Sequence, residues 1–151
     1  WAERTTILAG SLGADIATVS IWVQVATGTG RPAALTRQFV NAYGSACDGR
    51  KVSARLVLAA PIAPASVIPW AVRRADLDPF DHVNNAANWA FVEESVNGMM
   101  PRRGRAEMEF VGPVTYGTSV QSVVERADGA TSMWLLNEGS VLSAARWSPA
   151  G

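Results

Sequence analysis

Cysteine, histidine and lysine are nearly absent from this chain of 151 residues, which contains Cys47, His82 and Lys51 as the only residues of their types. A lone cysteine excludes an intramolecular disulfide framework and a cysteine-based metal cage, and it favours a reducing, cytoplasmic compartment. A lone histidine argues against a transition-metal site. P-loop, dinucleotide-binding, HExxH and nucleophile-elbow patterns are missing as well, so we expect no metal and no cofactor.

Net charge and long apolar runs are the next absences. Thirteen basic residues balance thirteen acidic ones, which removes the electrostatic argument for a nucleic-acid or membrane partner. No stretch approaches the roughly 18 consecutive apolar residues of a membrane-spanning helix. A hydrophobic content of 48% excludes intrinsic disorder. The chain suits one ordinary domain, or one small domain with a piece of another.

The first third of the chain predicts two strands and a short helix. Strands are expected at 4–10 and 17–26, where β-branched residues are frequent, followed by a turn over 27–32. A helix is expected from 37 until Gly44. Prolines then favour an extended linker up to Pro69. Because the chain begins with Trp1 and not Met, we expect a fragment or a processed form.

The remainder predicts an α+β domain in which an antiparallel sheet wraps one long helix. A strand is expected at 70–75, a helix at 83–96, and further strands at 105–112, 118–126, 131–137 and 141–147. The turn dipeptides Asp128-Gly129 and Glu138-Gly139 predict that the last three strands form an antiparallel meander. Helical spacing predicts one buried stripe made of Val83, Ala86, Ala87, Ala90, Phe91 and Glu94.

Reactive side chains concentrate at the start of that helix. The cluster consists of Asp76, Asp78, Asp81, His82, Asn84 and Asn85. A helix N-terminus offers unpaired N–H groups and partial positive charge, which suit an oxyanion, and a nearby carboxylate can activate water or attack a carbonyl. The alternative is structural, because Asp and Asn before a helix are common caps, Asp81 among them. A calcium loop is disfavoured because the Gly and the distant Glu of an EF-hand are missing.

This segment resembles the acyl-acyl-carrier-protein thioesterases of the hot-dog fold. Their second domain carries a run close to R-x-x-D-L-D-x-N-x-H-V-N-N, which is similar to residues 73–85 here, with Trp89, Glu94 and Ser95 downstream. The sequence IWVQVATGTGRPAAL upstream resembles the end of that family's first hot dog. The resemblance implies the last strands and a short helix of a first hot dog at 1–44, a linker at 45–69 and a complete second hot dog at 70–151.

The family's catalytic positions are only half occupied. Asp78 and His82 match the first and last members of its Asp-x-Asn-x-His set, but Phe80 stands at the Asn position. The family's catalytic Glu and the Cys that often follows it align with Pro113 and Val114. Asp78 could then be the main carboxylate, Glu94 on the helix could substitute for the missing acid, or activity could be lost.

The resemblance implies a thioesterase that hydrolyses a fatty acyl thioester of acyl-carrier protein, or of CoA, in fatty acid metabolism. Asp78 would be base or nucleophile, His82 and Asn84 would orient water or the carbonyl, and the first helical amides would hold the oxyanion. Substrate would contact Asn85, Ala87, Ala90 and Phe91, and the acidic carrier would dock on Arg102, Arg103 and Arg105.

The sequence leaves two other functions open. One is a hot-dog hydratase or dehydratase, because residues 76–82 are similar to the Asp-x-Asn-Pro-x-His motif of those enzymes. The other is a catalytically silent acyl-binding or structural hot dog. Since a single hot dog leaves a sheet edge or face unpaired, we also expect either a pseudo-dimer with a first hot dog or a homo-oligomer.

Overall fold

The computed structural model describes residues 2–9, 15–47, 55–62, 67–95 and 103–150. The chain divides into two compact units, residues 1–55 and 56–151. This division falls within the expected linker, residues 45–69. The domain limits 1–44 and 70–151 stay a prediction.

The first unit contains a hairpin and a short helix. Strands β1 (Ala2–Ala9) and β2 (Asp15–Trp22) pair antiparallel. Helix α1 (Arg37–Tyr43) begins where the Thr36 hydroxyl accepts the Phe39 N–H, ends at Gly44 as predicted, and continues as the 3₁₀ turn η1 (Gly44–Cys47).

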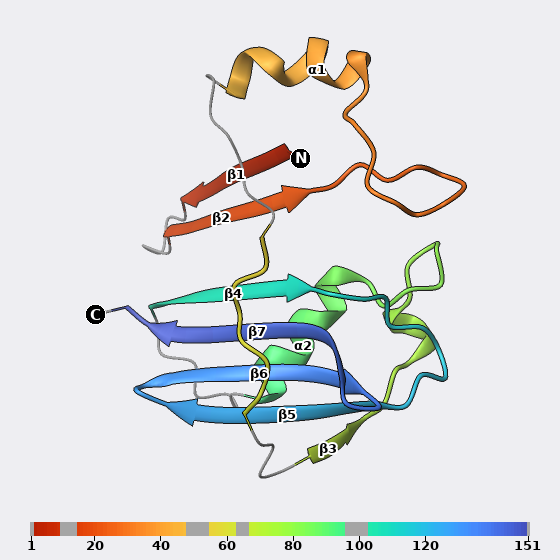
Figure 1. Ribbon diagram of the computed structural model, residues 1–151. Helices are drawn as coiled ribbons and strands as arrows, with labels where there is room; N and C mark the ends of the chain where they lie inside the picture. Colours follow the sequence, from red (N-terminus) through yellow and green to blue (C-terminus); the bar gives the residue numbers. More distant parts are fainter. Residues whose placement is uncertain (1, 10–14, 48–54, 63–66, 96–102, 151) are drawn as a thin grey trace. The chain divides into compact units, whose positions relative to one another are not determined.

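The second unit is a five-stranded antiparallel sheet in the order β3-β5-β6-β7-β4 (Figure 1). Its strands are β3 (Val67–Trp70), β4 (Gly104–Phe110), β5 (Val120–Ala127), β6 (Ala130–Asn137) and β7 (Ser140–Pro149). The predicted meander is confirmed, because β5, β6 and β7 pair in succession. Both connecting turns have positive φ at two successive residues, Asp128-Gly129 and Glu138-Gly139, as a two-residue type I′ hairpin requires.

The strand predicted at 70–75 is wrong in position. The strand observed here is β3, which overlaps the predicted linker, and residues Arg74–Asp76 form the 3₁₀ turn η2. Pro69 suggested a linker, but β3 is an edge strand, where a residue without an N–H is tolerated.

Helix α2 (Asn85–Ser95) covers one face of the sheet (Figure 1). Its buried residues are Asn88, Phe91 and Val92, of which Phe91 and Val92 pack with sheet residues such as Met133 and Leu135. The predicted stripe is confirmed for Phe91, which is buried, but it is wrong for Ala86 and Glu94, which are exposed. Alanine contributes little apolar area, so the larger Phe91 and Val92 determine which face is buried.

The opposite face of the sheet is crossed by residues 55–62 (Figure 1). The Glu109 carboxylate accepts the N–H groups of Val57 and Leu58 at 2.6 and 3.1 Å, and the Trp134 Nε1–H donates to the Ala59 carbonyl at 2.8 Å. Leu58 packs on Trp134 and its neighbours. Both faces of the sheet are thus covered within this unit. Among the described residues, no helix has the length and apolar character needed to cross a membrane.

Candidate active site at the start of helix α2

An open pocket of about 320 Å³ lies where the first turn of α2 meets the end of β4. Its polar lining comes from Asp78, His82, Asn85, Asn88 and Ser143. Its apolar lining includes Val83 and the segment 110–114. Ser143 reaches this pocket because β7 pairs it with Phe110, the last residue of β4. The structure thus brings together three of the predicted site residues, namely Asp78, His82 and Asn85.

The loop 78–82 is a tight turn organised by the Asp78 side chain. Asp78 Oδ1 accepts the N–H groups of Phe80 and His82 at 2.8 and 3.1 Å, and the Asp81 N–H donates to the Asp78 carbonyl at 3.0 Å. Asp81 has a φ of 59°, a conformation that Asp tolerates better than most residues. The turn fixes the Asp78 carboxylate at the pocket. Within the described part of the chain, its Oδ2 accepts no hydrogen bond.

His82 and Val83 attach the loop to its surroundings through their backbones. His82 forms an isolated bridge with Thr115, Val83 forms one with Leu77, and the Val83 N–H donates to the Val114 carbonyl at 2.7 Å. The helix predicted from Val83 therefore begins two residues later. The His82 imidazole is exposed at the pocket and has no hydrogen-bond partner among the residues that are described.

Asn84 is the N-terminal cap of α2. Its Oδ1 accepts the Ala86 N–H at 2.8 Å, and its own N–H donates to the Asp76 carbonyl at 2.7 Å. The capping interpretation given to Asp81 is wrong, because Asn84 has this place. The Asn84 side chain does not line the pocket.

Capping leaves one amide open at the helix start. The N–H groups of Val83, Asn84 and Ala86 are all bonded. The Asn85 N–H has no acceptor among residues 2–9, 15–47, 55–62, 67–95 and 103–150, and Asn85 lines the pocket. An open N–H at a helix N-terminus can hold a developing oxyanion.

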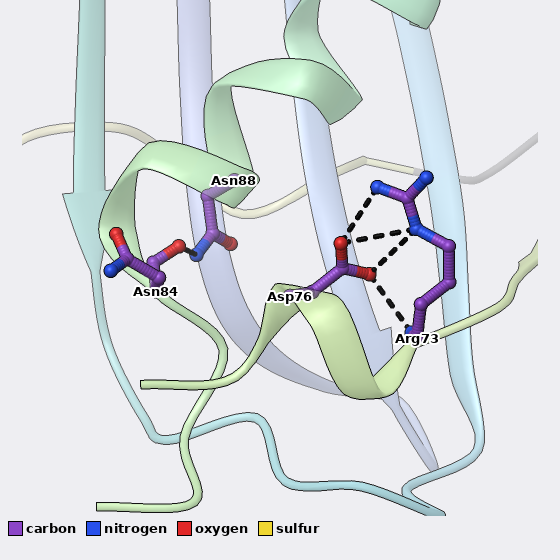
Figure 2. Close-up of polar contacts among 4 residues, drawn as sticks. All are labelled: Arg73, Asp76, Asn84 and Asn88. Carbon is purple, nitrogen blue, oxygen red and sulfur yellow. Dashed lines mark hydrogen bonds and ion pairs between the residues drawn. The ribbon is translucent and has the colours of Figure 1, made fainter. Parts of the chain in front are cut away.

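Asp76 is buried behind this loop and pairs with Arg73 (Figure 2). Its carboxylate accepts the Arg73 backbone N–H at 2.8 Å and the guanidinium Nη2 at 2.7 Å. These hydrogen bonds hold the pKa of the Asp76 carboxyl below its ordinary 3.8, although burial opposes the shift. Because the Asp76 carbonyl also accepts the Asn84 N–H, the pair joins the loop to the helix start.

In Asp76→Asn, the free energy of unfolding is expected to fall less between neutral and acid pH than it does in the wild type. A lowered pKa in the folded state adds stability above pH 3.8, and this stability is lost as the pH falls below that value. The variant lacks this component, and near pH 7 its unfolding free energy should be lower by about 1 kcal/mol. Urea unfolding between pH 7 and pH 2.5 measures it, with the exposed Asp81→Asn as control. Identical profiles for Asp76→Asn and the wild type would contradict this role.

Asn88 and Ser143 are site residues that sequence reasoning missed. Asn88 is 4% exposed and Ser143 is 3% exposed, and the Ser143 hydroxyl lies 3.5 Å from Asn88 Oδ1. The sequence signal for Asn88 was its polar side chain three residues after Asn85, on the same helix face as Phe91 and Val92.

Several other predicted positions lie outside the pocket. Glu94 is exposed in the last turn of α2, about 14 Å along the helix axis from Asn85. Phe91 is 1% exposed in the core, where it packs edge-on against Trp70. Ala90 is half-buried, and Ala87 lines a separate cavity of about 10 Å³ beside Asp76.

The two substituted family positions differ in location. Pro113 lines the pocket together with Asp78 and His82. Phe80 is 78% exposed on the turn and is not part of the lining.

Arg103 and Arg105, two of the expected docking arginines, lie at the far end of β4 from the pocket. Arg103 is exposed, and Arg105 pairs with Glu107 at 2.6 Å. Arg102 lies outside the described residues. Arg105 and Phe110 are five positions apart along the strand, or about 17 Å.

Comparison with known proteins relates this arrangement to a family. The model of the acyl-ACP thioesterase C-terminal domain matches residues 60–144, more than half of the chain. Two uncharacterised proteins of Mycobacterium tuberculosis, from strains CDC 1551 / Oshkosh and ATCC 25618 / H37Rv, are each 29% identical over 147 residues. Each alignment covers 96% of this chain and 59% of the relative. The chain thus spans about three fifths of these relatives.

Solved structures show the same fold at low identity. The 12:0-ACP thioesterase from Umbellularia californica superposes with a TM-score of 0.66 at 19% identity, over 98% of this chain and 62% of that protein. An acyl-ACP thioesterase from Bacteroides thetaiotaomicron gives a TM-score of 0.65 at 16% identity, over 97% and 61%. The antiparallel sheet around α2 is therefore a hot-dog fold, as predicted, and the chain belongs to the acyl-ACP thioesterase family.

Proposed function

We propose that this chain carries the catalytic pocket of a thioesterase that hydrolyses a fatty acyl thioester of acyl-carrier protein, or of CoA. The observation that carries the proposal is the pocket itself. It combines a fixed carboxylate (Asp78), an imidazole (His82) and an open helical N–H (Asn85) beside apolar wall residues. These groups suit attack on a carbonyl and stabilisation of the resulting oxyanion.

The proposed reaction uses Asp78 as the base. Asp78 Oδ2 removes a proton from water while the water oxygen bonds to the thioester carbonyl carbon. The Asn85 N–H stabilises the oxyanion, and His82 orients the water. Collapse of the tetrahedral intermediate breaks the carbon–sulfur bond, and the proton held by Asp78 passes to the departing sulfur. The products are a fatty acid and a thiol.

Direct attack by Asp78 is the alternative step within the same function. Single turnover in ¹⁸O-water detects direct attack when the resulting Asp78–acyl anhydride is hydrolysed at the Asp78 carbonyl carbon, because the label then stays in Asp78. Attack by water places the label in the fatty acid, as does hydrolysis of the anhydride at the acyl carbon, so label in Asp78 is the outcome that establishes direct attack. Mass spectrometry of the protein and of the product reads both.

A second candidate, a catalytically silent acyl-binding domain, is favoured by Pro113. This residue lines the pocket at the position where the family resemblance places a glutamate. Proline offers neither a carboxylate nor an N–H, so the pocket depends on the groups that remain.

Free-thiol release by the full-length protein tests the proposal. A panel of acyl-carrier-protein and acyl-CoA thioesters should yield thiol in proportion to fatty acid. With enoyl-CoA, loss of conjugated absorbance without thiol would indicate a hydratase. Binding of acyl thioesters without any turnover, by folded protein, would select the silent domain and reject hydrolysis.

Arg103→Glu is expected to raise KM for an acyl-carrier-protein substrate by about 3–10-fold, with kcat little changed, because carrier docking is electrostatic. Arg105→Glu should have a smaller effect, since Glu107 already pairs with Arg105. The difference in KM between Arg103→Glu and the wild type should become smaller at high salt, because salt screens the interaction between charges. Acyl-pantetheine, which lacks the acidic carrier, is the control substrate. An equal rise in KM for acyl-pantetheine would contradict docking at Arg103.

A further inference from the structure

Asn88 is a buried amide at the boundary of two cavities. It is 4% exposed, yet it lines both the open pocket with Asp78 and His82 and the cavity of about 10 Å³ with Asp76. Figure 2 shows its side chain extending from α2 toward Asn84. Buried polar side chains are normally held by several good hydrogen bonds.

The hydrogen bonds of Asn88 are few and long. Its Nδ2 donates to the Asn84 carbonyl at 3.3 Å, and its Oδ1 accepts from the Ser143 hydroxyl at 3.5 Å. An amide offers two donor hydrogens and two acceptor lone pairs. One hydrogen on Nδ2 therefore remains available in the part of the chain that the structure describes, and the common distance for such bonds is near 2.9 Å.

The helix directs this hydrogen-bonding capacity toward the candidate oxyanion site. Residues i and i+3 share a helix face, and side chains tilt toward the helix N-terminus. Asn88 therefore extends back toward Asn85, whose backbone N–H is the open donor. Both residues line the open pocket, and the bond from Asn88 to the Asn84 carbonyl confirms that its amide reaches the first turn.

We propose that the Asn88 Nδ2–H is a second donor to the carbonyl oxygen of the acyl thioester, beside the Asn85 N–H. This inference rests on the proposed function, because it assigns the substrate atom that Asn88 binds. Ser143 is a positioning residue: its hydroxyl bonds to Oδ1 and orients the amide so that Nδ2 is on the side of Asn84. Asn88 thus adds a hydrogen-bond donor to a pocket in which Pro113 stands where the family resemblance places a glutamate.

Asn88→Leu tests the proposal, since leucine has nearly the same size and no donor. We expect kcat for thiol release to fall about 100-fold, as with removal of one oxyanion donor, and KM to change less than threefold. Val92→Ala is the matched control, because Val92 is buried one turn further along α2 and lines neither cavity. Urea unfolding of both variants checks that they are folded, and Asn88→Ala replaces Asn88→Leu if leucine disturbs the core.

A spectroscopic readout separates substrate contact from a structural role. The probe is an acyl-pantetheine ketone in which a methylene group replaces the sulfur, so it binds without hydrolysis. Its carbonyl stretching band should lie at lower frequency on the wild type than on Asn88→Leu, and Val92→Ala should match the wild type. An unchanged band, or a kcat within threefold of the wild type, would overturn the role of Asn88.

The two proposals fail in different ways. If the wild type releases no thiol but Asn88→Leu still alters the carbonyl band, hydrolysis is rejected and the Asn88 contact stands. If the wild type is active and neither kcat nor the band changes, only the Asn88 inference is rejected. Absence of probe binding to the wild type would overturn the Asn88 contact.

Discussion

Asp78→Asn is expected to lower kcat for acyl thioester hydrolysis by about 10²–10⁴-fold, the usual contribution of a general base. The loop should remain folded, because the asparagine Oδ1 can still accept the N–H groups of Phe80 and His82. The substitution therefore removes the base and keeps the turn. Steady-state thiol release measures the effect.

Asp81→Asn is the matched control for this variant. Asp81 belongs to the same turn, is exposed and does not line the pocket, and asparagine also tolerates its positive φ. Its kcat should stay within about twofold of the wild type, since surface changes away from such features have small effects. Equal losses in the two variants would show that turn structure, and not the Asp78 base, controls activity.

Glu94→Gln tests which carboxylate acts in catalysis, because the sequence suggested both Asp78 and Glu94 for this role. Glu94 is exposed at the opposite end of α2, so we expect its neutralisation to leave kcat unchanged. A loss comparable with that of Asp78→Asn would move the proposed base to the helix.

Phe91→Ala is expected to lower the free energy of unfolding by about 3–5 kcal/mol, the usual cost of removing a buried phenyl ring. Phe91 is 1% exposed and packs edge-on against Trp70, with ring centroids 5.4 Å apart. Urea unfolding measures the loss, and Glu93→Ala, exposed on the same helix, should change stability by less than about 0.5 kcal/mol.

The same variant tests the substrate role that the sequence suggested for Phe91. If Phe91 contacts the acyl chain, Phe91→Ala should shift the chain-length preference and leave stability nearly intact. A large loss of stability with an unchanged preference among the remaining folded molecules would place Phe91 in the core alone.

Features set by local chemistry were predictable from the sequence. The two hairpin turns follow from Asp-Gly and Glu-Gly pairs, whose positive φ values match type I′ geometry. Asp78 and His82 were predicted as candidate site residues, because a cluster of such residues before a helix is visible without a structure, and both line the pocket. The structure adds that Asp78 organises its own turn through Oδ1.

Features set by tertiary packing were not predictable in the same way. Helical spacing placed both Phe91 and Glu94 on one buried stripe, but the sheet buries Phe91 together with Asn88 and Val92 and leaves Glu94 exposed. Asn88 lies on the buried face, but apolar periodicity did not predict its burial because its side chain is polar. Prolines such as Pro69 suggested a linker, and the sequence did not show that Pro69 pairs with Gln121, which lies far along the chain.

Single-turnover thiol release from an acyl-acyl-carrier-protein by the full-length protein, run beside Asp78→Asn and Asp81→Asn, decides whether Asp78 is the base of a thioesterase. We expect stoichiometric thiol and fatty acid from the wild type and Asp81→Asn, and at least a hundredfold slower release from Asp78→Asn. Equal rates for all three, or no release by folded wild type that binds the substrate, would contradict this role of Asp78.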